Sequence, residues 1–205
     1  MPEDPAHLRR EVKGALRERM HALRRALPAA ARQERSRLAC ETLMRLGCYQ
    51  ESRVIALYSA FDHELDTTSL LEAAWSEPKT VALPRLNRHT HTISFHAVRD
   101  HKALSKSPLG IAEPQEDSPT MDLTAVDIVV VPALAADARG HRIGYGHGHY
   151  DRVLARMPTA TRICLIYDFQ LLVELPDEGH DERAHVVLTD QRVLDLRARD
   201  GRVRS

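Results

Sequence analysis

The sequence predicts an α/β fold in three layers, with a mostly parallel central sheet and helices on both of its faces. Helix-like and strand-like segments alternate along the chain, and several of the strands are short, uninterrupted apolar runs. Such runs are typical of parallel strands covered on both faces, because a half-exposed strand alternates apolar and polar residues. The length of 205 residues suits one domain, which we expect to span residues 1–205.

Helices are expected mainly in the N-terminal part of the chain. The first spans residues 5–27, where apolar residues recur at helical spacing behind an Asp4 N-cap and a proline. The second spans residues 29–47 and ends at Gly47, because glycine commonly ends a helix. A short third helix, capped by a threonine, is expected over residues 67–75.

The strands are predicted from short apolar or alternating segments. They are residues 53–58, 80–84, 92–98, 127–132, 162–167, 185–188 and 192–196. The run over residues 127–132 (DIVVVP) is the most hydrophobic, so we expect it at the centre of the sheet. Residues 150–157 are expected to be helical. The proline-rich segment 107–124 is longer than an ordinary connection, which suggests a functional loop or a covering arm.

Composition argues against several classes of protein. Lys plus Arg and Asp plus Glu both number 29, and aromatic residues are only 4%, so nucleic-acid binding is disfavoured. No stretch approaches the ~20 apolar residues of a membrane span, and the polar N-terminus shows no secretory signal. The three cysteines lack metal-ligand spacing and are expected in the core. A cytoplasmic chain is the simplest interpretation, and a monomer is favoured.

The zero net charge hides an asymmetry along the chain. Residues 1–50 carry eleven Lys or Arg against six Asp or Glu, and the rest of the chain carries the opposite excess. One interpretation is a solvated basic face on two surface helices. The other is that one or two of these cations reach an anionic ligand, and the pattern alone leaves both open.

A glycine-rich segment follows the predicted central strand. Residues 132–151 read PALAADARGHRIGYGHGHYD, in which Gly144, Gly146 and Gly148 alternate just before a predicted helix. Glycine lets successive backbone N–H groups point into one concavity, and a helix N-terminus adds partial positive charge. Ligands of open α/β sheets bind beyond the carboxyl ends of the strands. The segment therefore predicts a phosphate site, with a plain turn as the alternative.

Further residues in and around this segment form a longer pattern. The central run is Asp127-x(4)-Pro132, then Asp137-x-x-Gly140-x-Arg142-x-Gly144-Tyr145-Gly146-x-Gly148-x-Tyr150-Asp151-Arg152. Three other segments accompany it: Lys13-x-x-x-Arg17, residues 58–67 (YSAFDHELDT), and Leu175-Pro176 with His180-Asp181. In order and over nearly the whole chain, this pattern resembles the 5-formyltetrahydrofolate cyclo-ligase family, also called methenyltetrahydrofolate synthetase.

The resemblance implies a particular reaction. It is the ATP-dependent, Mg²⁺-requiring ring closure of 5-formyltetrahydrofolate to 5,10-methenyltetrahydrofolate, with release of ADP and phosphate. Phosphorylation turns the formyl oxygen into a good leaving group, and the N10 amine then closes the ring. Such chemistry depends mainly on positioning and on neutralising developing charge.

The resemblance also implies roles for individual residues. The ATP contacts would be Lys13, Arg17, Arg142, Gly144, Tyr145, Gly146, His147, Gly148, His149 and Tyr150. The folate contacts would be Ser59, Phe61, Glu64, Tyr145, His147 and His149. Asp151 and Asp181 would hold Mg²⁺, because two carboxylates with phosphate oxygens and water suit this cation. No separate catalytic side chain is assigned.

Taken without the family, the same residues have plainer interpretations. Asp151 could cap the following helix, and Asp181 could be an ordinary loop acid. Lys13 and Arg17 share one helix face, which could simply be solvated, and Phe61 could be a core residue.

Four positions depart from the family pattern. Ala133 stands where the family usually has glycine, Ala136 and His149 where it has aromatics, and His147 where it often has glycine or lysine. Each lost aromatic stack on the pterin would be worth ~0.5–1.5 kcal/mol beyond burial. The alternatives are therefore a cyclo-ligase-like enzyme with an altered substrate and a non-catalytic nucleotide- or folate-binding homologue.

A transition-metal site is a further alternative. His147 and His149 are two residues apart, with His141 and Asp151 nearby, and all four are possible ligands. The same His-x-His spacing occurs at residues 89–91, in a segment without other site features, which weakens this interpretation.

Overall fold

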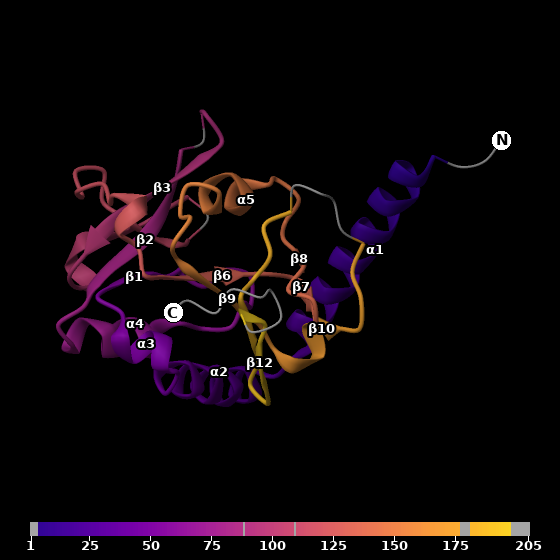
Figure 1. The fold of residues 1–205 in the computed structure, drawn as a ribbon, viewed down its shortest axis with the longest axis horizontal. Coiled ribbons are helices and arrows are strands. Elements are labelled where there is room, and N and C mark those ends of the chain that lie inside the picture. Colours follow the sequence, from indigo (N-terminus) through magenta and orange to yellow (C-terminus); the bar gives the residue numbers. More distant parts are fainter. Residues whose placement is uncertain (1–3, 88, 109, 177–180, 198–205) are drawn as a thin grey trace.

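A seven-stranded sheet forms the centre of the molecule, in the strand order β12-β11-β9-β6-β1-β2-β3 (Figure 1). The computed structural model describes residues 4–87, 89–108, 110–176 and 181–197. The strands are β1 (Val54–Ala56), β2 (Thr80–Asn87), β3 (Thr92–Val98), β6 (Ile128–Pro132), β9 (Thr161–Leu165), β11 (Val186–Leu188) and β12 (Val193–Asp195). Neighbouring inner strands are parallel, and the edge strands β3 and β12 are antiparallel to them. The predicted fold class is confirmed, with β6 at the centre.

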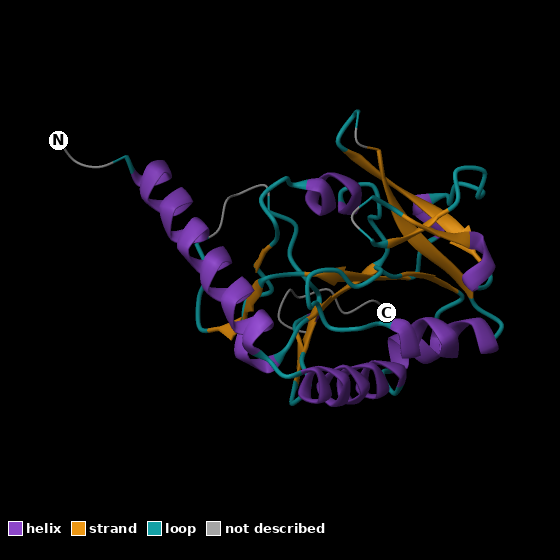
Figure 2. Ribbon diagram, turned by 180° about the vertical axis from the view of Figure 1, so that it is seen from behind, coloured by secondary structure: helices purple, strands orange, loops and turns teal. Residues whose placement is uncertain are grey.

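Helices cover both faces of this sheet (Figure 2). α2 (Ala29–Met44), α3 (Gly47–Glu51) and α4 (Thr68–Ser76) lie on one face, and α5 (His149–Leu154) lies on the other. Successive side chains of β6 point to opposite faces, so Val130 packs with the first helix group and Val129 and Val131 pack with α5. All three valines are fully buried, which explains why β6 is apolar without alternation.

The long helix α1 (Pro5–Ala26) lies beside the sheet and projects beyond the body at its N-terminus (Figure 1). The Asp4 side chain accepts a hydrogen bond from the Ala6 amide at 3.0 Å, as expected of an N-cap. Near its C-terminus, α1 buries Met20 in a small second core with Ile143 and Leu175. That core lies under a three-stranded sheet of β7 (Ala135–Asp137), β8 (Arg142–Ile143) and β10 (Leu171–Leu172).

Some predicted boundaries are wrong. α2 ends at Met44, and Gly47 begins α3, because the chain turns after α2 to bury Tyr49 in the main core. Thr67 occupies the N-cap position of α4, but its hydroxyl donates to the Tyr58 carbonyl at 2.6 Å. The Asp66 side chain instead accepts from the first backbone amide of α4. α5 is shorter than the predicted 150–157, and β7, β8 and β10 were not predicted.

The proline-rich segment 107–124 covers an edge of the sheet. It includes β5 (Ala112–Pro114), which pairs with β4 (Leu104–Lys106). The Ala97 amide donates to the Pro119 carbonyl, and the Met121 amide donates to the Phe95 carbonyl. Both hydrogen bonds join the segment to β3, the strand at this edge of the sheet. The covering-arm interpretation therefore holds. The described residues also include the short 3-10 helices η1 (His101–Ala103), η2 (Leu123–Ala125) and η3 (Asp168–Gln170).

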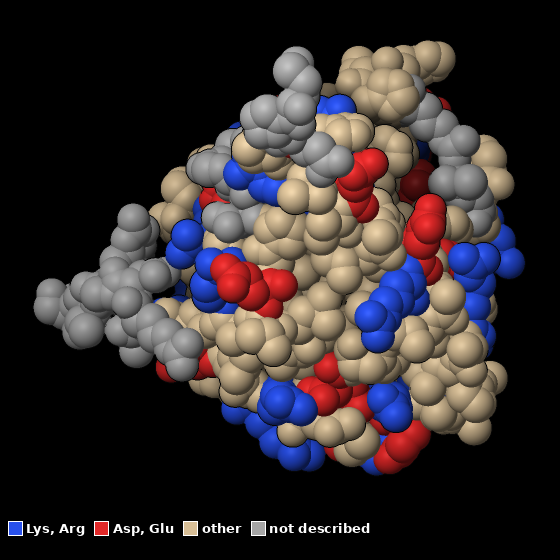
Figure 3. Space-filling view, turned by 90° about the vertical axis from the view of Figure 1, so that its right-hand side faces the viewer, with Lys and Arg blue, Asp and Glu red and all other residues tan. Residues whose placement is uncertain are grey.

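Two expectations from composition can be compared with the structure. The cysteines are unpaired, and Cys40 and Cys164 are buried while Cys48 is half-buried. Among the described residues, no helix is long and apolar enough to cross a membrane. On the face at the right-hand side of Figure 1, basic and acidic side chains are interspersed (Figure 3).

Candidate active site

A pocket of about 410 Å³ lies between α1, the glycine-rich segment and the start of α5. It opens beyond the carboxyl end of β6, whose last residue, Pro132, is part of its wall. It is lined by Arg10, Lys13, Arg17, Ile93, Pro132, Arg142, Ile143, Gly144, Tyr145, Gly146, His147, Gly148, His149, Tyr150, Asp151 and Asp181. Every residue assigned above to ATP or Mg²⁺ belongs to this set. Residues from distant parts of the sequence thus meet at one place, where open α/β sheets bind their ligands.

The glycine-rich segment forms one wall of the pocket. Gly146 has φ +98° and Gly148 has φ +62°, so both adopt the left-handed conformation that favours glycine. Within the described part of the chain, no backbone carbonyl accepts a hydrogen bond from the amides of residues 144–148. Those N–H groups therefore remain available to an anion, as the sequence suggested.

Cations from α1 form the opposite wall. Arg10, Lys13 and Arg17 all line the pocket, and Arg17 Nε donates to the Gly144 carbonyl at 3.0 Å. A Cβ atom at Gly146 would lie 3.4 Å from the Arg17 guanidinium, so the helix and the loop are in close contact. Part of the basic excess of residues 1–50 is thus directed at a pocket, as the second interpretation of the asymmetry requires.

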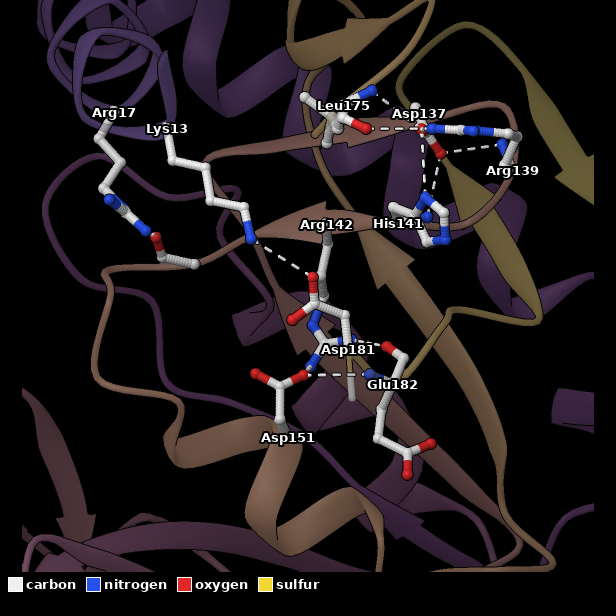
Figure 4. A network of polar contacts seen from close by, with 11 residues as sticks. Lys13, Arg17, Asp137, Arg139, His141, Arg142, Asp151, Leu175, Asp181 and Glu182 are labelled. Carbon is white, nitrogen blue, oxygen red and sulfur yellow. Dashed lines mark hydrogen bonds and ion pairs between the residues drawn. The ribbon is translucent and has the colours of Figure 1, made fainter. Parts of the chain in front are cut away.

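Each acid of the pocket lies against a cation (Figure 4). Arg142 Nη2 lies 2.6 Å from Asp151 Oδ1, and Lys13 Nζ lies 3.4 Å from Asp181 Oδ2. Arg142 also donates to the Glu182 carbonyl, and the Glu182 amide reaches Asp151 Oδ1 at 3.4 Å. The N-cap position of α5 is taken by Gly148, so the capping interpretation of Asp151 is wrong.

The donor set limits which metal ion the pocket suits. Within the described residues, no group of three or more His, Cys, Asp or Glu is placed to hold a metal ion by itself. Mg²⁺ is commonly held by one or two carboxylates together with substrate phosphates and water. Asp151 and Asp181 fit that arrangement, because both line a pocket that is also walled by cations and free amides.

The transition-metal alternative gains no support from the histidines. The rings of His147 and His149 stack, with centroids 5.2 Å apart and an interplanar angle of 21°. His141 does not line the pocket, because it is buried, with Nδ1 3.6 Å from Asp137 Oδ2. The stacked pair presents flat rings at the pocket wall, and burial lowers the pKa of His149.

The residues assigned to folate lie at a different place from those assigned to ATP. Ser59, Phe61 and Glu64 do not line the pocket, but Tyr145 connects Glu64 to it. The Tyr145 hydroxyl donates to Glu64 Oε1 at 3.0 Å, and the Phe61 amide donates to Glu64 Oε2 at 2.9 Å. Burial raises the pKa of Glu64, and the nearby Arg24 guanidinium opposes this rise.

Arg24 is a residue that the sequence analysis missed. The residue is only 1% exposed, its side chain donates to the Ala133 carbonyl, and its Nη1 donates to the Tyr145 hydroxyl oxygen at 3.2 Å. The spacing of Arg10, Lys13, Arg17 and Arg24 places all four on one side of α1, and this was the available signal.

Asp137 organises the turn that presents Arg142. The Asp137 carboxylate is fully buried and accepts from the backbone amides of Arg139, His141 and Leu175 at 2.9–3.0 Å. It thereby ties the β7–β8 turn to the segment after β10. This acid of the family pattern has a structural role in the described residues.

Two of the four departures from the family pattern are explained by burial. Ala133 and Ala136 are both fully buried and do not line the pocket. An aromatic side chain at position 136 would enter the core beside α5, so its absence removes no stacking surface from the pocket. His147 and His149 do line the pocket.

These features define an α/β protein with a basic, glycine-walled pocket at the carboxyl end of its central strand. Residues 9–190 match the model of the family described as the 5-formyltetrahydrofolate cyclo-ligase family. The chain therefore belongs to the 5-formyltetrahydrofolate cyclo-ligase family of enzymes, and the resemblance drawn from the sequence is confirmed.

Curated relatives and solved structures agree with this assignment. The chain is 31% identical over 174 residues to a 5-formyltetrahydrofolate cyclo-ligase of Escherichia coli K12, covering 83% of this chain and 96% of that protein. It is 29% identical over 170 residues to the Haemophilus influenzae protein of the same name, covering 81% of this chain and 91% of that protein. The NMR structure of Aquifex aeolicus 5,10-methenyltetrahydrofolate synthetase matches with a TM-score of 0.81 and 30% identity, covering 91% of this chain and 93% of that one. The Mycoplasma pneumoniae enzyme, at 21% identity and a TM-score of 0.71, shares the fold.

Proposed function

We propose that this protein catalyses the ATP- and Mg²⁺-dependent cyclisation of 5-formyltetrahydrofolate to 5,10-methenyltetrahydrofolate, releasing ADP and phosphate. Membership of the cyclo-ligase family supports the reaction. The observation that carries the assignment to this site is the composition of the pocket. One cavity is lined by cations of α1, by two carboxylates and by residues 144–148, whose amides donate to no backbone carbonyl of the described residues. That combination suits a metal-bound triphosphate.

The chemistry requires two successive displacements. The formyl oxygen first attacks the γ-phosphorus, and ADP leaves. The N10 amine then attacks the formyl carbon, N10 loses its proton, and phosphate departs with the former formyl oxygen. Neither step needs a covalent protein intermediate, so the side chains act by positioning the reactants and by stabilising charge.

The phosphate chain of ATP is assigned to the basic wall of the pocket. Lys13, Arg17 and Arg142 would neutralise its oxygens, and the amides of residues 144–148 would donate to them. Asp151 and Asp181 would hold Mg²⁺, which would offset the negative charge of the phosphates. Arg142 and Lys13 contact these two acids in the structure.

The folate is assigned to the region between the pocket residue Tyr145 and the Glu64 loop, which lies beside the pocket. Glu64 would hydrogen-bond the pterin, with Ser59 and Phe61 beside it. Tyr145 contacts both Glu64 and the pocket, so it lies where the formyl group and the γ-phosphate would have to meet. The stacked rings of His147 and His149 offer a flat surface, and at position 149 the family commonly has an aromatic side chain.

An absorbance assay for the methenyl product tests the proposal. Product should form from 5-formyltetrahydrofolate with ATP and Mg²⁺, and should fail to form when ATP is omitted or Mg²⁺ is chelated. Binding of both ligands without turnover would instead favour the non-catalytic homologue. Turnover of ATP with a different formylated pterin, and none with 5-formyltetrahydrofolate, would favour an altered substrate, to which His147 and His149 would contribute.

A further inference from the structure

The C-terminal half of α1 contacts the loop that carries the proposed folate residues. His21 Nδ1 lies 2.8 Å from Asp62 Oδ2, and Arg24 Nη1 lies 4.0 Å from Glu64 Oε1. These contacts are one helical turn apart on α1, so one face of the helix holds two acids of the loop. The first half of the same helix supplies Lys13 to the pocket.

The loop itself is in an unfavourable backbone conformation. Asp62 has φ 45° and His63 has φ 60°, in the left-handed region that non-glycine residues rarely adopt. The turn is closed by the Glu64 amide, which donates to the Phe61 carbonyl, and by the Phe61 amide, which donates to the Glu64 carboxylate. Such conformations persist where surrounding contacts over-determine them, and they gather at functional sites. The contacts from α1 are of this kind.

Arg24 lies at the centre of these contacts. It donates to the Tyr145 hydroxyl oxygen, and the same hydroxyl donates to Glu64, so the three side chains form a hydrogen-bonded chain. Arg24 and Glu64 are 1% and 7% exposed, so their charges stabilise each other with little screening by water. A guanidinium beside a buried carboxylate favours its ionised form. Arg24 therefore acts on both Glu64 and the pocket residue Tyr145.

We propose that Arg24 is a positioning residue that fixes the Glu64 carboxylate and the Tyr145 hydroxyl in the orientation that the folate meets. In this scheme Arg24 acts through Tyr145 and Glu64, which it contacts, and it touches neither ATP nor folate. The inference rests on the proposed function, which assigns folate to Glu64 and Tyr145. It extends that function by making folate recognition depend on a buried cation of α1, the helix that also binds the nucleotide.

Separate binding measurements for the two substrates test the proposal. Calorimetry would give the Kd of 5-formyltetrahydrofolate and of ATP for the wild type, Arg24→Met, Glu64→Gln and the double variant Arg24→Met/Glu64→Gln. Arg25→Met is the matched control, since Arg25 is the exposed neighbour on the same helix. Urea unfolding of each protein separates stability from binding. The readout is binding, so it does not depend on turnover.

The expected result separates the two substrates. Arg24→Met should weaken folate binding by about tenfold or more, the scale of a lost hydrogen bond to a charged group, and leave ATP binding within about twofold. The double variant buries no unpaired charge, so it should regain stability over Arg24→Met while folate binding stays weak. Because the two residues act through one contact, the double variant should bind folate no worse than the weaker single variant.

Other outcomes would overturn the proposal. Wild-type folate affinity in Arg24→Met or in the double variant would show that Arg24 only supports the fold. Equal weakening of ATP and folate would show a general distortion of the pocket. If Arg24→Met does not fold, Arg24→Lys keeps the buried charge but cannot serve both the Ala133 carbonyl and Tyr145, and it should still weaken folate selectively. Failure of the proposed function would be visible separately, as a wild type that forms no methenyl product with ATP.

Discussion

Arg142 and Asp151 neutralise each other across 2.6 Å in the pocket wall. Lys13 and Asp181 form a second such pair at 3.4 Å. In the proposed function, the two cations serve phosphate oxygens and the two acids serve Mg²⁺. The cations assigned to the phosphates therefore contact the acids assigned to the metal. Nucleotide and metal should each bind better when the other is present, because each frees the partner that the other needs.

Asp181→Asn tests this exchange of partners, in which Lys13 leaves Asp181 to bind phosphate and Asp181 binds Mg²⁺. Removing the carboxylate takes away a partner that competes with phosphate for Lys13, so ATP binding without Mg²⁺ should tighten by about twofold to fivefold, the scale of a partly exposed ion pair. The gain in ATP affinity on adding Mg²⁺ should shrink in the same variant. Calorimetry of ATP binding with and without a chelator measures both. Glu182→Gln is the control, because that side chain pairs with Arg162 outside the pocket. Weaker metal-free binding in Asp181→Asn would refute the exchange.

Asp151→Asn should lower turnover while leaving the protein folded. The amide oxygen still accepts from Arg142 and the Glu182 backbone, so the local contacts persist. The lost charge should raise the Mg²⁺ concentration for half-maximal activity by about tenfold to a hundredfold. A Mg²⁺ titration of the product-forming rate, with urea unfolding as the check on folding, measures this. Wild-type rates and Mg²⁺ dependence at saturating folate would remove Asp151 from the metal site.

Lys13→Met should affect ATP far more than folate. A charged hydrogen bond to phosphate is worth ~1.5–3 kcal/mol, so the KM for ATP should rise about tenfold to a hundredfold. The KM for folate should change little, because Lys13 pairs with Asp181, whereas the folate is assigned to Tyr145 and Glu64, which contact each other. Arg19→Met removes an exposed cation of the same helix that does not line the pocket, and serves as the control. An unchanged KM for ATP in Lys13→Met would exclude the assignment.

Two parts of the pocket, its glycine-rich wall and its basic helix face, could be predicted from the sequence because their determinants are local. The alternation of Gly144, Gly146 and Gly148 and the spacing of Lys13 and Arg17 each fix a short piece of backbone or one helix face. The central position of β6 follows from its uninterrupted apolar run. A strand that is buried on both faces has apolar residues at every position, whereas a half-exposed strand alternates apolar and polar residues. These features do not depend on knowing which distant segments meet.

Other parts of the site depend on contacts between distant segments. The hydrogen-bonded chain joins Arg24, Tyr145 and Glu64, which are far apart in the sequence. Arg24 stands among other charged residues of α1, so nothing in the sequence indicates that it is buried. The strands β8 and β10 have two residues each, too few to show periodicity. The predicted end of α2 at Gly47 was wrong, because glycine commonly but not always ends a helix. Here the burial of Tyr49 determines where α2 ends.

Gly140→Ala should destabilise the protein strongly. Gly140 has φ +86°, and a Cβ there would lie 2.4 Å from the Ala184 carbonyl oxygen, so the β7–β8 turn would have to move away from that segment. Strain and displacement together should cost about 2 kcal/mol or more of unfolding free energy. Gly144→Ala is the matched control, because no atom lies within 4 Å of a Cβ at that position. Equal urea midpoints for the two variants would contradict the packing of Gly140 against Ala184.

Burial of Glu64 predicts a pH dependence of stability. Burial raises the pKa of Glu64 above its ordinary value, although Arg24, the Phe61 amide and Tyr145 oppose the rise. Between the unfolded and the folded pKa of Glu64, the carboxyl binds more protons in the folded protein than in the unfolded chain. The unfolding free energy of the protein therefore falls as pH rises through that window. Below that window, the stability that the protonated Glu64 contributes is fully present.

The Glu64→Gln variant has no carboxyl to titrate. Its unfolding free energy should therefore fall less than that of the wild type as pH rises from the ordinary glutamate pKa upward. Arg24→Met should steepen the wild-type slope, because it removes the cation that favours the ionised form. Urea unfolding across this pH range measures the three slopes, and a slope in Glu64→Gln equal to that of the wild type would show that Glu64 does not titrate differently in the folded protein.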